Sequence, residues 1–97
     1  MNIKILPIAN DDLLNGYQFY EQQKKGLGSY FLDSLFSDVD SLLIYHGTHL
    51  ILFGKYYRLL SKRFPFAIYY TVKDGEIIIY AVLDCRKEPA WIESRFD

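Results

Sequence analysis

The chain has 97 residues, a formal net charge of −1, 51% hydrophobic residues and 24% charged residues, which is typical of a globular protein and excludes a disordered chain. This length predicts one domain over residues 1–97, and no apolar run approaches the roughly 20 residues that cross a membrane. The only cysteine, Cys85, excludes an intramolecular disulfide and a cysteine-based zinc site. A single free cysteine and an N-terminus without a secretory segment predict a cytoplasmic protein.

Charge is unevenly distributed along the chain. Residues 1–46 carry three Lys and six acidic residues, whereas residues 47–97 carry eight Lys or Arg and six acidic residues. Between Tyr45 and Thr71 every charged residue is basic, namely Lys55, Arg58, Lys62 and Arg63. A local basic stretch on a nearly neutral chain favours a focused contact with an anionic surface.

The N-terminal part predicts a strand followed by a helix. Met1–Leu6 alternates apolar residues with a period of two, and Pro7 ends the strand because it lacks an amide donor. Helical spacing of apolar residues then predicts a helix over residues 11–24, with Asn10 as its N-cap and Gly26 as its stop.

A second helix is expected from Gly28-Ser29 to about Tyr45. Its apolar stripe consists of Leu32, Leu35, Phe36, Val39, Leu42 and Leu43. The opposite face is expected to be polar, with Asp33, Ser37, Asp38, Asp40 and Ser41. The short link between the helices predicts an antiparallel hairpin with an apolar face that a sheet must cover.

The C-terminal half predicts that sheet. Leu50–Phe53 and Tyr56–Leu60 flank a possible two-residue turn at Gly54-Lys55, and Phe66–Val72 and Ile77–Leu83 flank Asp74-Gly75, the strongest hairpin signal of the chain. Pro89 is suited to open a short terminal helical turn. The expected fold class is α+β: an N-terminal strand and an α-helical hairpin packed on a curved antiparallel sheet of three to four further strands.

Three blocks, in order and in register, resemble the RelE/ParE superfamily of toxins from bacterial type II toxin–antitoxin modules. They are YQFYEQQKKGLGSYFLDSL (Tyr17–Leu35), KRFPFAIYYTV (Lys62–Val72) and AVLDCRKEPAWIESR (Ala81–Arg95). The helical part is more similar to ParE than to RelE. The resemblance implies a RelE/ParE-like fold and a growth-inhibiting toxin, typical of plasmid stabilisation modules, which a cognate antitoxin holds inactive.

The resemblance leaves two activities open, because RelE-type members cut messenger RNA in the ribosomal A site whereas ParE-type members poison DNA gyrase. The chain departs from the common pattern at Asp84, where the pattern commonly has His. An unperturbed Asp is already ionised near neutral pH and repels RNA phosphate, so this residue disfavours acid–base ribonuclease chemistry.

The predicted target-binding site is a basic set of four residues. It consists of Arg58, Arg63, Arg86 and Lys87, with Lys62 and Trp91 in support. Arg58 is the strongest of these, because the resemblance implies a basic residue on its strand. Alternatively Asp84 pairs with one of these bases, and Trp91 is expected to cap the open end of the sheet rather than to contact a partner.

Other chemistry finds little support in the sequence. His46 and His49 lack a third ligand for a metal, Cys85 has no identifiable base beside it, and no glycine-rich loop that would bind a phosphate is present. We therefore expect no metal and no cofactor, and the catalytic residues of a nuclease stay unassigned.

The leading hypothesis is a ParE-like toxin whose partners are its antitoxin and DNA gyrase, with no membrane partner. The alternative is a RelE-like, ribosome-dependent endoribonuclease whose partners are the ribosome and messenger RNA. A third hypothesis is a non-toxic remnant that still binds an antitoxin.

Overall fold

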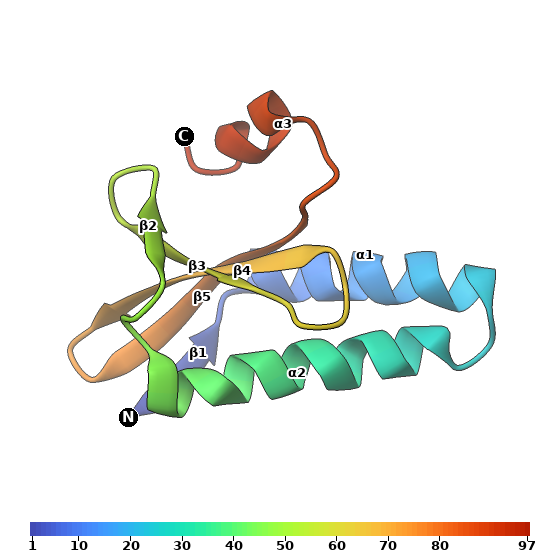
Figure 1. The fold of residues 1–97 in the computed structure, drawn as a ribbon, viewed down its shortest axis with the longest axis horizontal. Coiled ribbons are helices and arrows are strands. Elements are labelled where there is room, and N and C mark those ends of the chain that lie inside the picture. The colour runs from blue at the N-terminus through green and yellow to red at the C-terminus, as the bar shows by residue number, and fades with distance from the viewer.

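A mixed sheet of five strands, in the order β1-β5-β4-β3-β2, separates a helical hairpin on one face from a short C-terminal helix on the other (Figure 1). The computed structural model describes all residues 1–97. The elements are β1 (Asn2–Ile5), α1 (Pro7–Gln23), α2 (Leu27–Tyr45), β2 (Leu50–Leu52), β3 (Tyr56–Leu60), β4 (Phe66–Lys73), β5 (Glu76–Asp84) and α3 (Pro89–Ser94). The predicted α+β fold class is confirmed.

The N-terminal strand makes the sheet mixed. β1 pairs with β5 in parallel, with Asn2 opposite Glu76, while the four strands β2 to β5 pair antiparallel with their sequence neighbours. The helical hairpin connects β1 to the rest of the sheet. β1 and β2 are therefore the two edge strands, although most of the chain separates them in the sequence.

The first helix begins earlier than its sequence suggests. Its N-cap is Leu6 in an extended conformation and Pro7 occupies the first turn, so the expected cap at Asn10 is wrong. A proline has no amide N–H, but the amides of the first turn have no hydrogen-bond partner within the helix, so nothing is lost at this position. The fixed φ of proline also suits the helix. Because of the earlier start, Asp12 lies in the body of the helix rather than in its first turn.

Two glycines let α1 and α2 pack closely. A Cβ atom added at Gly16 would lie 2.5 Å from the ring of Phe31, and one at Gly28 would lie 2.7 Å from Tyr17. The turn between the helices is closed by the carboxylate of Glu21, which accepts hydrogen bonds from the backbone amides of Gly26 and Gly28. The expected antiparallel hairpin is thus confirmed, and its glycines are required by side chains of the other helix.

The buried face of α2 differs at its borders from the predicted stripe. Leu35, Val39 and Leu42 are buried as expected, whereas Phe36 and Leu43 are exposed. Asp38, expected on the polar face, is buried and accepts a hydrogen bond of 2.6 Å from the hydroxyl of Ser61. The buried face is therefore rotated toward Asp38, which ties α2 to the loop after β3.

Both hairpin turns of the sheet place their central residues at positive φ. Asp74 and Gly75, at φ of 52° and 74°, form the predicted turn between β4 and β5. Between β2 and β3 the central residues are Phe53 and Gly54, at 54° and 82°, with the amide of Lys55 bonded to the carbonyl of Leu52. The predicted turn at Gly54-Lys55 is therefore wrong by one residue.

The two faces of the sheet carry separate clusters of buried apolar residues. A cluster of 13 residues lies between the sheet and the helical hairpin, and a cluster of five lies on the opposite face under the C-terminal segment. Phe96 covers the second cluster, with its ring 4.8 Å from that of Phe53, 4.8 Å from Tyr56 and 4.7 Å from Tyr69. None of the three helices is both long enough and apolar enough to cross a bilayer.

Candidate functional site

Two loops that carry most of the predicted basic residues lie beside each other at one end of the sheet. Phe66, the first residue of β4, is opposite Asp84, the last residue of β5. The amide of Cys85 then donates to the carbonyl of Pro65 over 2.8 Å, which joins the loop before β4 to the loop after β5. Lys62 and Arg63 in the first loop, and Arg86 and Lys87 in the second, are all exposed.

Arg58 approaches these loops from within the sheet. It lies on β3 opposite Tyr69 and, by strand alternation, on the face turned away from the helical hairpin. Its Nε atom is buried and has no hydrogen-bond partner within the chain. A buried guanidinium nitrogen without an acceptor is costly, so the hydrogen bonds of Arg58 are incomplete within the chain.

The positive charge of Arg58 affects the pKa values of two nearby groups, Tyr69 and Cys85. Burial raises the pKa values of the Tyr69 hydroxyl and of the Cys85 thiol, and the positive charge of Arg58 opposes both shifts. Both groups are therefore protonated near neutral pH, so neither supplies a ready base or nucleophile.

Asp84 and Arg86 form a closed pair. The Arg86 guanidinium donates from Nε and Nη2 to the two carboxylate oxygens of Asp84 over 2.9 and 2.7 Å, and the Arg86 amide donates to Oδ1 over 2.8 Å. These hydrogen bonds hold the pKa of Asp84 below its ordinary value and raise that of Arg86. The expected pairing of Asp84 with a nearby base is confirmed, and it neutralises one of the four predicted binding residues.

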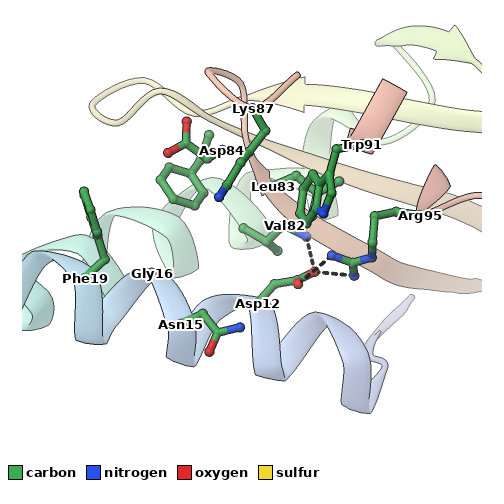
Figure 2. A pocket seen from close by; sticks show the side chains of 11 residues that line it. Asp12, Asn15, Gly16, Phe19, Val82, Leu83, Asp84, Lys87, Trp91 and Arg95 are labelled. Carbon is green, nitrogen blue, oxygen red and sulfur yellow. Dashed lines mark hydrogen bonds and ion pairs between the residues drawn. The ribbon is translucent and has the colours of Figure 1, made fainter. Parts of the chain in front are cut away.

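A cavity of about 330 Å³ lies between α1, the end of β5 and α3. Figure 2 shows Asp12 at its base, where the carboxylate accepts two hydrogen bonds of 2.9 Å from Arg95 and one of 3.0 Å from the amide of Val82. β1 ends before this part of β5, so Asp12 provides an acceptor where the neighbouring strand is missing. Asp12 therefore joins the first helix, the sheet and the C-terminal segment.

Trp91 and Lys87 lie at the mouth of this cavity (Figure 2). The Lys87 ammonium is 5.5 Å from the centre of the indole ring, and the Arg95 guanidinium is 5.7 Å from it. Trp91 is 42% exposed and lines the cavity with Val82 and Leu83 of β5, so it lies over this end of the sheet and also reaches solvent. Phe96 covers the second cluster, over Tyr56 and Tyr69.

The predicted basic residues thus divide into two groups. Arg63 and Lys62 are exposed on one loop next to the partly buried Arg58, while Arg86 is paired with Asp84 and Lys87 is held over Trp91. The sequence did not single out Asp12 or Phe96, which anchor the C-terminal segment. The ion pair of Asp12 links residues 83 positions apart, so no local pattern points to it.

The histidines have structural partners. His46 bonds through Nδ1 to the carbonyl of Leu42 over 2.8 Å, and His49 bonds through Nδ1 to the hydroxyl of Tyr70. Across residues 1–97, no group of three or more His, Cys, Asp or Glu side chains is arranged to hold a metal ion.

Comparison with known proteins identifies the architecture. No family model matches the sequence, and no curated protein matches it at a significant level. In three dimensions the chain is similar to a chain of the solved "Chromosomal ParDE TA system from P. aeruginosa", with a TM-score of 0.78 and 21% identity, over 84% of this chain and 92% of that chain. The chain has the RelE/ParE-like fold. The resemblance of the three sequence blocks is therefore confirmed at the level of the fold.

Proposed function

We propose that this RelE/ParE-like chain is the toxin component of a type II toxin–antitoxin module and that a cognate antitoxin neutralises it. The observation that carries the proposal is the likeness to a chain of a ParDE toxin–antitoxin system over 92% of that chain's length. The three sequence blocks support it, because they fall in the expected order on this fold. A fold by itself does not define a target, so the target has to be argued from the site.

The proposed action is binding and poisoning of DNA gyrase rather than cleavage of RNA. Cleavage requires groups that take up and release a proton close to the cationic residues. The pKa of Asp84 is lowered by Arg86, and that of Tyr69 is raised by burial, so both are far from the neutral range. Burial lowers the pKa of His49 below its ordinary value, and this side chain bonds Tyr70 on the other face of the sheet. These environments support inhibition by binding.

The proposed binding surface centres on the basic residues that have no acidic partner. Arg58, Arg63 and Lys87 are its principal cations, with Lys62 and Trp91 beside them. Arg86 contributes less, because its charge is offset by Asp84 at 2.7 Å. This ranking keeps Arg58 first in the predicted set of Arg58, Arg63, Arg86 and Lys87 and lowers the expected contribution of Arg86.

The experiment measures growth and both activities in parallel. Induced expression should arrest bacterial growth, and the product of a neighbouring antitoxin gene should restore it. The purified chain should inhibit gyrase supercoiling and leave messenger RNA on purified ribosomes intact. Cleavage of that message with gyrase unaffected would overturn the choice of target and favour the ribosome-dependent nuclease. Normal growth at a high soluble level would instead favour the non-toxic remnant.

Two variants sharpen this test. Arg58→Ala should weaken gyrase inhibition by at least about tenfold, the effect of one lost charge-assisted contact of about 1.5–3 kcal/mol. Lys73→Ala is the matched control, because this exposed base lies at the opposite end of β4. Asp84→His tests the alternative, since a gain of ribosomal cleavage in this variant alone would indicate a nuclease that has lost its acid–base group.

A further inference from the structure

The cavity between α1, the end of β5 and α3 is lined by buried apolar residues and has an aromatic side chain on either side. Phe66, Val82 and Leu83 line it and are buried. Phe19 on α1 and Trp91 on α3 are partly exposed, and Figure 2 shows them on opposite sides of the cavity. The volume of about 330 Å³ lies at the lower end of the range of small-molecule sites.

Both carboxylates that line the cavity are already engaged by arginines. Asp12 accepts hydrogen bonds on both oxygens from Arg95 and a further one from the amide of Val82. Asp84 accepts hydrogen bonds on both oxygens from Arg86. A cationic ligand would therefore have to displace an arginine in order to reach either carboxylate.

Lys87 is the cation of the cavity that has no acidic partner. Neither of the two ion pairs of the chain includes it, and its ammonium lies 5.5 Å from the centre of the Trp91 ring. Figure 2 shows its side chain pointing from the loop after β5 toward α1. A neutral ligand covering this ammonium would remove it from water without compensation, which is unfavourable. A ligand with a single negative charge offsets it, whereas a more highly charged anion would also face the carboxylates of Asp12 and Asp84.

We propose that this cavity binds a small aromatic monocarboxylate. The carboxylate would accept a charge-assisted hydrogen bond from the Lys87 ammonium. The ring would pack against Trp91 and the buried Phe66, since aromatic rings pair favourably with one another. The assignment concerns the cavity as a ligand site and does not depend on the gyrase target.

Titration of the isotope-labelled full chain with phenylacetate, followed by NMR, tests the proposal. Trp91 is the only tryptophan, so its indole N–H gives a single signal that should shift together with the amide signals of Val82 and Leu83. The shifts should saturate with a dissociation constant of about 1 mM or below, as expected for a ligand of about ten non-hydrogen atoms. Phenylacetamide, which keeps the shape but lacks the charge, should bind at least about tenfold more weakly. Shifts that do not saturate, or equal binding of the acid and the amide, would overturn the proposal.

Two lysine substitutions separate the proposed contact from a general effect of charge. Lys87→Met keeps an apolar side chain beside Trp91 and removes the ammonium, so it should raise the dissociation constant of phenylacetate at least about tenfold. Lys73→Met is the matched control, because this exposed base lies at the opposite end of β4 from Phe66 and should leave binding unchanged. Equal affinities of the two variants would overturn the proposal. The comparison of the acid with the amide uses the unmodified chain, so it holds even where Lys87→Met fails to fold.

Discussion

A cluster of 13 buried residues, from both the helices and the strands, lies between the helical hairpin and one face of the sheet, whereas the opposite face has a cluster of only five buried residues under the C-terminal segment. α3 has no buried residue of its own. The segment is held by the pairing of Arg95 with Asp12 and by the contacts of Phe96 with the aromatic residues of β3 and β4.

This difference separates the part of the molecule that stabilises the fold from the part that can open locally. Elements with few buried apolar contacts open at a lower free energy than the global unfolding. The hairpin face should therefore unfold only with the whole chain, while residues 89–97 should detach from a sheet that stays folded. Substitutions on the two faces provide a direct test.

The largest effect is expected from Leu35→Asp on the hairpin face. Leu35 is fully buried, so the substitution places a carboxylate in an apolar cluster and should cost more than about 4 kcal/mol, enough to prevent folding. Ser37→Asp, on the exposed side of the same helix, should change stability by less than about 0.5 kcal/mol. Circular dichroism without denaturant should show that Leu35→Asp is unfolded, and urea denaturation measures the stability of Ser37→Asp. A folded Leu35→Asp protein would contradict the proposed core.

Asp38→Lys should cost about 2–4 kcal/mol, because it removes the acceptor of the Ser61 hydroxyl and buries a cation in its place. Asp40→Lys, at an exposed position of the same helix, serves as the control and should be nearly neutral. The same denaturation experiment distinguishes them. Equal stabilities would show that α2 does not turn Asp38 toward the loop after β3.

On the opposite face, Phe96→Ala and Asp12→Asn should each cost about 1–2 kcal/mol, since each removes one attachment of the C-terminal segment. Hydrogen exchange should show faster exchange in residues 89–97 and unchanged protection in α1 and α2. A loss of protection throughout the chain would mean that the segment belongs to the same cooperative unit as the hairpin.

The smallest effect concerns the pH dependence of stability. Burial lowers the pKa of His49 below its ordinary value of 6.5, so the unfolded chain binds the proton more strongly than the folded one. This contribution to stability is present above about pH 6.5 and is lost as the pH falls toward the folded pKa. The free energy of unfolding should fall by less than about 1.4 kcal/mol for each pH unit. His49→Gln should flatten the profile between about pH 7 and pH 5.5. His46→Gln is the control within the same loop and should leave most of the slope.

The fold could be predicted from local patterns because most of its elements depend on nearby residues. Helical spacing located the buried Leu35, Val39 and Leu42, and Asp74-Gly75 located a hairpin turn. The position of Asp38 could not be predicted, since its partner Ser61 lies 23 residues away. The start of α1 was missed because Pro7 both ends β1 and opens the helix.

The candidate site was less accessible to sequence reasoning. The sequence located the basic residues, but not that Arg86 is neutralised by Asp84 while the Nε atom of Arg58 is buried without a partner. The anchors of the C-terminal segment depend on contacts across the whole chain, from Asp12 to Arg95 and from Phe53 to Phe96. Such pairs follow from the path of the folded chain and leave no periodic signal.

The position of Trp91 makes the opening of this segment visible by fluorescence. It is the only tryptophan of the chain, and it lies on α3 within 6 Å of two cations, Lys87 and Arg95. Detachment of residues 89–97 would move the indole away from Lys87 and out of the cavity into water, which changes its emission. Circular dichroism, in contrast, reports mainly on α1 and α2. An emission change that precedes the loss of ellipticity would therefore show that the C-terminal segment detaches before the helices unfold, without any substitution in the protein.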